Sequence, residues 1–167
     1  MECTEWVTRL DLKPHPEGGW YREVYRSSDV VPAPALPPGF PGARSLCTSI
    51  YYLLGPTDAS AFHRIRSDEI WHLYAGGPLE LHLIDGSRYE VVVLGVDLMQ
   101  GEAPQVVVPK GVWFAATPRP DSPGVLVGCT VSPGFDFEDF EFGTAEKVFG
   151  ERPDLRAPLG HLIRSRA

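Results

Sequence analysis

Turn-forming residues divide this 167-residue chain into short segments, and their spacing is the feature that most limits its fold. The 17 glycines and 17 prolines recur between runs of β-branched and aromatic residues, a larger share than average globular composition contains. Gly-Pro, Gly-Gly-Pro, Asp-Gly-Ser and Pro-Lys-Gly separate successive runs. Short strands joined by tight turns, without helices between them, predict an antiparallel sandwich or a closed or nearly closed barrel.

Nine runs are rich enough in β-branched and aromatic residues to form strands. They cover residues 20–26, 46–54, 59–65, 69–74, 79–85, 89–94, 105–108, 112–116 and 125–132. We expect a helix over 4–10, an ordered proline-rich loop or flap over 30–44, and one or two short helices in the tail 143–167. The length fits a single domain over residues 1–167, since domains usually contain roughly 100 to 200 residues.

Charge and hydropathy exclude several classes of partner. The formal net charge of -7, without a stripe of lysine and arginine, predicts no nucleic-acid partner. No window approaches ~18 consecutive apolar residues, so no membrane partner is expected. The start of the chain lacks the basic and apolar regions of a secretory signal, which predicts a cytoplasmic protein. The three cysteines are widely spaced, which indicates neither a disulfide framework nor a thiolate metal site.

One segment with the pattern strand, turn, strand contains His63, Glu69 and His72. The even separation of His63 and Glu69 across this hairpin predicts that both side chains face one cavity. Glu69 begins an apolar strand, where a carboxylate is costly unless it is paired or used. Arg64 and Arg66 are the alternative partners that would make Glu69 part of a purely structural ion pair.

Two intervals resemble the motifs of the cupin superfamily. Glu69 precedes Gly76 by seven positions, and Pro109-Lys110-Gly111 supplies the Pro-x-Gly of the second motif. The whole chain resembles one family of small, uncharacterised cupins through four ordered signatures. These are His15-Pro-Glu-Gly-Gly, Arg44 with Thr48-Ser-Ile-Tyr-Tyr-Leu-Leu, Ser67-Asp-Glu-Ile-Trp-His, and Val127-Gly-Cys-Thr-Val-Ser-Pro-Gly-Phe.

This resemblance implies an all-β fold, a cupin jelly-roll antiparallel barrel with short helices at both termini. It also implies a homodimer and a pocket for a small-molecule ligand inside the barrel, but no established reaction. The first signature places His15 and Glu17 among the expected ligand-binding residues. The strand at 20–26 follows a Gly-Gly hinge, and we expect it to pair with the sheet edge of a second subunit.

The sequence Glu17-Gly-Gly-Trp-Tyr-Arg-Glu-Val-Tyr is similar, more distantly, to a strand of the dTDP-sugar epimerases. In those cupins the strand crosses toward the partner subunit and helps to hold the nucleotide sugar, which implies ligand-binding roles for Arg22 and Glu23. The same resemblance makes His63 the general base. The opposing acid is left open among Tyr21, Tyr25, Tyr51, Tyr52 and Tyr74.

A metal cofactor is not expected, because metal-binding cupins typically use three histidines and one glutamate. Trp113 and Phe114 stand where the last histidine would follow Pro-x-Gly. We assign both to core packing or to a ligand-binding wall. If a metal binds, His63, Glu69 and His72 are its candidate ligands. Glu69 and His72 have odd separation on one strand, so His72 joins this site only through a bulge and is otherwise structural, at the surface or in ligand binding.

We therefore predict a small-molecule-binding cupin that acts as a metal-independent isomerase or epimerase on a sugar-like or other small polar ligand. His63 is its general base, since a histidine titrates near neutrality, and Glu69 orients or tunes it. Two alternatives remain, because one fold hosts many functions. The first is a non-catalytic metabolite-binding protein, and the second is a metal-dependent oxygenase or lyase.

Overall fold

A computed structural model of the protein describes residues 3–164. Its helices are short: α1 Cys3–Arg9, α2 Ala145–Phe149 and α3 Arg156–Leu159, with 3-10 turns η1 Ala33–Ala35, η2 Leu98–Gln100, η3 Phe137–Asp139, η4 Pro153–Leu155 and η5 Gly160–Leu162. Within this range no helix is long and apolar enough to cross a membrane. Helical segments thus lie near both ends of the chain, as expected, and the rest of the fold is built from strands.

The strands agree closely with the nine expected runs and add four short ones. They are β1 Lys13–Pro14, β2 Trp20–Arg26, β3 Val30–Val31, β4 Arg44–Ser45, β5 Thr48–Leu54, β6 Ser60–Arg64, β7 Asp68–Gly76, β8 Leu79–Asp85, β9 Arg88–Leu94, β10 Gln105–Val108, β11 Trp113–Pro118, β12 Val125–Ser132 and β13 Glu141–Phe142. The match follows from local composition, because β-branched and aromatic side chains fit a pleated, half-buried surface.

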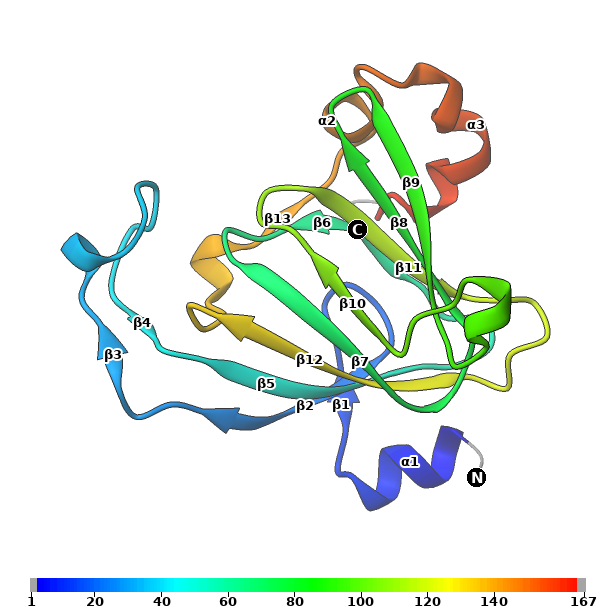
Figure 1. The fold of residues 1–167 in the computed structure, drawn as a ribbon, viewed down its shortest axis with the longest axis horizontal. Coiled ribbons are helices and arrows are strands. Elements are labelled where there is room, and N and C mark those ends of the chain that lie inside the picture. The colour runs from blue at the N-terminus through cyan, green and yellow to red at the C-terminus, as the bar shows by residue number, and fades with distance from the viewer. Residues whose placement is uncertain (1–2, 165–167) are drawn as a thin grey trace.

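Two antiparallel sheets hold most of these strands (Figure 1). The larger sheet has the order β1-β2-β5-β12-β7-β10, and the smaller has the order β13-β6-β11-β8-β9. The prediction of a closed barrel is wrong. Where the edges β9 and β10 approach each other, the described residues form a single parallel bridge between Leu94 and Ala103, so no continuous ladder joins the sheets there.

The main core lies between the two sheets. Alternate residues of each strand point inward, which buries Tyr52, Trp71 and Val127 from the larger sheet against Phe114 and Leu81 from the smaller. The tail packs elsewhere. Its helices bury side chains such as Val148 and Phe149 against Phe62 and Ile84 of the smaller sheet. Large side chains therefore fill the space between the two sheets, except at the end where polar residues point inward.

The proline-rich segment forms an arm that extends from the sheets (Figure 1). It runs from β3 through η1 to β4, and β3 and β4 pair with each other as a separate two-stranded ladder. The loop or flap expected over residues 30–44 thus corresponds to this arm. Beside it, β1 pairs with Trp20 and Tyr21, and within residues 3–164 no strand pairs with the rest of that edge of β2.

A buried ion pair ties the arm to η3. Arg44 of β4 donates from Nε to Asp139 Oδ2 at 2.6 Å and from a terminal nitrogen to Oδ1 at 3.0 Å. Both side chains are almost completely buried, and Arg44 also contacts Glu138 at 3.2 Å. This two-bond geometry fixes the orientation of η3, whose aromatic residues lie at the open end of the sandwich.

Removing one member of this pair should destabilise the fold far more than removing both. Asp139→Leu leaves the Arg44 charge buried without its main partner, and we expect a loss of about 3–5 kcal/mol in the free energy of unfolding. The double variant Arg44→Met/Asp139→Leu should recover most of that loss. Urea unfolding of the two variants and the wild type measures both values. A double variant no more stable than Asp139→Leu would contradict this account.

Candidate functional site

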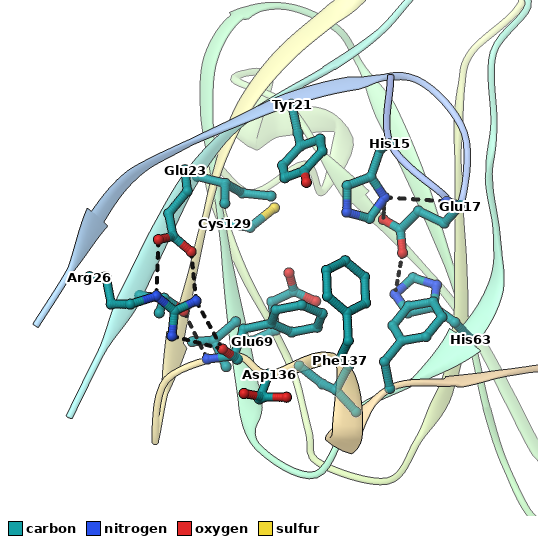
Figure 2. A pocket seen from close by; sticks show the side chains of 16 residues that line it. His15, Glu17, Tyr21, Glu23, Arg26, His63, Glu69, Cys129, Asp136 and Phe137 are labelled. Atoms are coloured by element: carbon teal, nitrogen blue, oxygen red, sulfur yellow. Dashed lines mark hydrogen bonds and ion pairs between the residues drawn. The ribbon is translucent and has the colours of Figure 1, made fainter. Parts of the chain in front are cut away.

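A cavity of about 230 Å³ opens between the two sheets, at the end where β2 and η3 meet. Figure 2 shows side chains from β2, β6, β7, β12 and the η3 region converging on it. Its lining combines titratable groups with apolar and aromatic ones: His15, Glu17, Tyr21, Glu23, Arg26, Thr48, Ile50, His63, Ile65, Glu69, Cys129, Val131, Phe135, Asp136, Phe137 and Phe140.

The turn between β1 and β2 carries Glu17 into the interior. Gly18 has φ +118°, and a Cβ built there would lie 2.0 Å from the carbonyl oxygen of Ala59, so the turn approaches the chain more closely than other residues permit. The Tyr52 hydroxyl donates to the Gly18 carbonyl at 2.8 Å, and the Ala61 amide donates to the Glu17 carbonyl at 2.9 Å. These contacts place the Glu17 carboxylate beside β6.

Glu17 and His63 share one proton. The His63 Nδ1 atom lies 2.7 Å from the Ala61 carbonyl oxygen, which can only accept, so Nδ1 carries a hydrogen. The opposite nitrogen, Nε2, lies 3.0 Å from Glu17 Oε2. A contact of that length between two lone pairs is unfavourable, so either Nε2 or the carboxyl holds a proton between them.

Burial determines how that proton is held. Burial lowers the pKa of His63, although the nearby Glu69 carboxyl acts to raise it. Burial also raises the pKa of Glu17, although the nearby His15 acts to lower it. Both shifts favour a neutral imidazole hydrogen-bonded to a protonated Glu17. The pair is then uncharged, and it becomes a base once the shared proton leaves.

His15 supports the same carboxyl from the other side. Its Nδ1 accepts the Glu17 backbone amide at 3.3 Å and lies 3.6 Å from Glu17 Oε1. The ring meets Tyr21 edge to face, with centroids 4.4 Å apart. Burial lowers the pKa of His15, so near neutrality the ring is neutral with its hydrogen on Nε2.

Glu69 of β7 points into the cavity and is only 8% exposed (Figure 2). Burial, and then the nearby Glu17 carboxyl, raise its pKa to about 7, while His63 acts in the opposite direction. The alternative in which Arg64 or Arg66 pairs with Glu69 is not the arrangement found. Arg64 binds Glu141, and Arg66 lies 3.5 Å from Asp139, because both side chains leave the hairpin on its outer side.

Charged and aromatic side chains form the rim of the cavity. Arg26 contacts the Glu23 carboxylate at 2.7 Å and 3.0 Å and also donates to the Phe135 carbonyl. Asp136 accepts the Glu138 amide at the start of η3. Phe137 stands beside it and is largely exposed, as Figure 2 shows at the open side of the cavity.

The structure brings together five of the nine residues expected in the site: His15, Glu17, Glu23, His63 and Glu69. Four lie outside the cavity lining. Arg22 lies over the Tyr51 ring, and His72 is half-buried on the opposite side of β7 from Glu69. Trp113 packs under Arg64, and Phe114 is buried behind His63. Their roles in ligand binding stay predictions.

Arg26 and the η3 region are the parts of the site that the sequence interpretation missed. Strict alternation along β2 places Tyr21 and Glu23 on the inner face and would turn Arg26 outward. A bulge between Glu23 and Tyr25 shifts the register, so Arg26 also lines the cavity. For Asp136, Phe137 and Phe140, the alternation of acids and phenylalanines was the available signal.

The donor set does not fit a transition metal. Both ring nitrogens of His63 are engaged, with Ala61 and with Glu17, and His72 faces away from Glu69. Among residues 3–164, no three His, Cys, Asp or Glu side chains are grouped so that they could hold a metal ion. We therefore derive no step through a metal.

Comparisons with known proteins identify similar chains. The profile of a family described as Cupin superfamily (DUF985) matches residues 4–143. An uncharacterised protein of Saccharomyces cerevisiae is 34% identical over 169 residues, which cover 93% of this chain and 83% of that protein.

Solved structures resemble the fold over nearly its whole length. A hypothetical protein from Leishmania major has a TM-score of 0.87 at 34% identity, with 99% of this chain and 100% of that chain covered. A protein from Shewanella oneidensis has a TM-score of 0.85 at 38% identity, with 99% of each chain covered. Oxalate decarboxylase from Bacillus subtilis has a TM-score of 0.54 at 16% identity, covering 90% of this chain and 37% of that one, a likeness of fold alone.

The raised pKa of Glu69 predicts a specific dependence of stability on pH. The pKa of Glu69 rises from an ordinary value of 4.5 to about 7 on folding. Between these two pH values the folded protein therefore keeps a proton that the unfolded chain has lost. Stability due to this group is therefore complete below pH 4.5 and falls as pH rises to about 7. Glu69→Gln removes the effect, so relative to wild type it should gain about 2–3 kcal/mol between pH 5 and pH 8.

Urea unfolding of both proteins at the two pH values measures this gain. Carbon-13 NMR of the wild type should show a carboxyl that titrates near pH 7 and is absent from the variant. Parallel stability profiles for the two proteins would contradict the assignment.

Proposed function

The chain belongs to the DUF985 family of the cupin superfamily, and we propose that its cavity binds a small polar molecule and isomerises it by proton transfer without a metal. The expected cupin resemblance is thus confirmed. One observation carries the proposal: the Glu17–His63 pair, which holds one shared proton, and Glu69, with a pKa of about 7, meet in the same cavity. Paired groups of this kind supply the base and the acid of a proton-transfer reaction.

The reaction balances with protein groups alone. In its deprotonated state the Glu17–His63 pair takes a proton from a carbon next to a carbonyl, so that the C–H bond breaks and an enolate forms. Protonated Glu69 then gives its proton to carbon, so that a new C–H bond forms and the enolate returns to a carbonyl compound. The pair then releases its proton to solvent and Glu69 regains one, with no net oxidation or reduction.

The orienting role differs from the one expected from the sequence. Glu17, and not Glu69, holds His63 directly, at 3.0 Å. Glu69 acts on His63 through its charge, which raises the pKa of the imidazole. We therefore assign Glu17 as the positioning partner of the base and free Glu69 for the acid role.

Tyr21 is the tyrosine best placed to replace Glu69 as the acid. It lines the cavity from β2, and in Figure 2 its hydroxyl is directed inward. The Tyr52 hydroxyl is committed to the Gly18 carbonyl. Tyr25, Tyr51 and Tyr74 do not contribute to the described cavity lining.

Hydrogen exchange at carbon tests the proposal. Wild-type protein is incubated in D2O with a metabolite extract, and mass spectrometry detects the compound that gains deuterium. We expect His63→Gln and Glu17→Gln to lower this exchange at least ~100-fold, the usual contribution of general base catalysis. His82→Gln is the matched control, because His82 is equally buried on β8 and hydrogen-bonded to Tyr89 and Thr117 outside the cavity.

The outcomes separate the competing functions. A compound that binds without deuterium gain would make the protein a metabolite-binding module. Exchange that persists in both cavity variants would remove the Glu17–His63 pair as the base. Equal losses in His82→Gln would show that the variants act through folding.

We also propose that the protein is a homodimer whose contact includes the open edge of β2. Beyond Tyr21 this edge has no neighbouring strand among the described residues, and unpaired edges tend to recruit another chain. Val24 is 41% exposed and Tyr25 is 54% exposed, so the unpaired edge carries exposed apolar side chains beside the charged pair of Glu23 and Arg26. Val30 and Leu46 add exposed apolar surface beside the arm.

Charges placed on this edge should separate the subunits. We expect wild-type protein to sediment at twice the mass of one chain at micromolar concentration, and Val24→Asp/Tyr25→Asp to sediment as a monomer. Analytical ultracentrifugation measures both, and Val96→Asp/Met99→Asp, in an exposed apolar loop far from β2, is the control. A monomeric wild type would refute the dimer.

A further inference from the structure

The cavity has more acidic groups than cations. Four carboxyl side chains line it, from Glu17, Glu23, Glu69 and Asp136, against the guanidinium of Arg26. The two lining histidines add no full positive charge near neutrality, because burial lowers the pKa of each. The ionisable groups that line the cavity and would face a ligand therefore carry a net negative charge.

Most of these acids already have a partner. Glu17 shares a proton with His63, and Glu23 binds Arg26 through both carboxylate oxygens. Asp136 lies at the rim and caps the first turn of η3. Its charge helps to raise the pKa of Arg26, so the two groups attract each other. Only Glu69, among the described lining acids, combines near-complete burial with the lack of an ion pair to a basic side chain.

Glu69 is surrounded by groups that cannot neutralise it. Cys129 and Trp71 lie beside the carboxyl, but Cys129 keeps its thiol proton because burial raises its pKa. The Trp71 indole and the Cys129 thiol act as hydrogen-bond donors toward Glu69 and lower its pKa, but neither group carries a positive charge. A buried carboxyl without a cation is costly, and a ligand that brings a cation removes this cost.

Aromatic rings complete the environment. Tyr21 approaches from β2, and Phe135, Phe137 and Phe140 form a cluster of edge-to-face contacts at the open side. The negative faces of such rings attract organic ammonium groups. From this combination we propose that the ligand carries a protonated amino group, which binds between Glu69 and these rings; the inference rests on the proposed small-molecule site but not on its catalysis.

The same charges disfavour anionic ligands. Arg26 already donates to both oxygens of Glu23 and to the Phe135 carbonyl, so a phosphate or carboxylate would find most of its donors engaged and a carboxylate beside it. Deeper in the cavity such a group would meet the Glu69 carboxyl. Substrates with phosphate or carboxylate groups at the buried end are therefore disfavoured once Glu69 is ionised.

Binding of an ammonium group must depend on pH. The groups facing Glu69 are Glu17 from the β1–β2 turn, His63 from β6, Trp71 from β7 and Cys129 from β12. As pH rises through about 7, Glu69 becomes charged and the ammonium group gains its partner. At lower pH, protonation of Glu69 and of the histidines opposes binding. The complex should therefore form more tightly at pH 8 than at pH 6, with release of a proton.

Three probes that share one six-carbon polyol chain test the proposal by isothermal titration calorimetry. Glucamine ends in an ammonium group, sorbitol in a hydroxyl and gluconate in a carboxylate. At pH 8 we expect glucamine to bind about tenfold more tightly than sorbitol, the effect of one charge-assisted hydrogen bond, and gluconate to bind weakest. Glu69→Gln should abolish the preference for glucamine.

The control is Glu102→Gln, which removes a similarly buried carboxyl that lies outside the cavity and binds Arg119. It should keep the preference. Glucamine that binds no more tightly than sorbitol, or does not bind, overturns the proposal, as does a preference that survives Glu69→Gln. Loss of the preference in Glu102→Gln as well would assign it to a general property of the fold and also overturn it.

An ammonium group bound to Glu69 keeps that carboxyl ionised, so for such a ligand the acid of the proposed reaction is Tyr21, the other acid candidate in the cavity lining. The two experiments still test separate claims. Tight glucamine binding without deuterium exchange in any ligand would keep the amine site and refute the isomerase. Exchange into an uncharged metabolite, with no preference for glucamine, would keep the isomerase and refute the amine site.

Discussion

The close approach of the β1–β2 turn to β6 is the constraint on which the candidate site depends. Gly18 comes so near the Ala59 carbonyl that a side chain would collide with it, and this approach is what places the Glu17 carboxyl beside His63. Without it, His63 would keep only its bond to the Ala61 carbonyl, and Glu69 would lose the neighbouring Glu17 carboxyl, which adds to the effect of burial in raising the pKa of Glu69. The arrangement of three titratable groups thus follows from a backbone contact made outside the cavity.

The interior tolerates these acids because none has to be fully ionised. Sharing one proton lets Glu17 and His63 remain neutral together, and a pKa of about 7 lets Glu69 be protonated during folding and charged when a cation arrives. The residues that give the cavity its chemistry are therefore the same residues that lower the stability of the empty protein at higher pH. Such a balance between stability and function is common in binding sites.

Much of the fold was predictable because runs of β-branched and aromatic residues mark most of its strands. The position of His63 and Glu69 in one cavity followed from their even separation. Contacts between distant segments were not predictable. The Glu17–His63 bond depends on how a turn docks, and the position of Arg26 depends on a bulge that leaves no clear mark in the sequence. The expected barrel is not closed, and the alternative arginine partners of Glu69 bind elsewhere. Local patterns left both points open because they do not specify which sheet edges meet or to which side a long side chain turns.

The Arg44–Asp139 pair has an evolutionary consequence. It joins the end of the proline-rich arm to η3, so a segment that supplies no residue to the cavity lining still helps to set the shape of its mouth. Between β3 and β4 the arm can change in length and composition at little cost in stability. Arg44 cannot change in the same way, because it is bound to Asp139. Related chains should accordingly vary in the middle of the arm and change Arg44 and Asp139 only together.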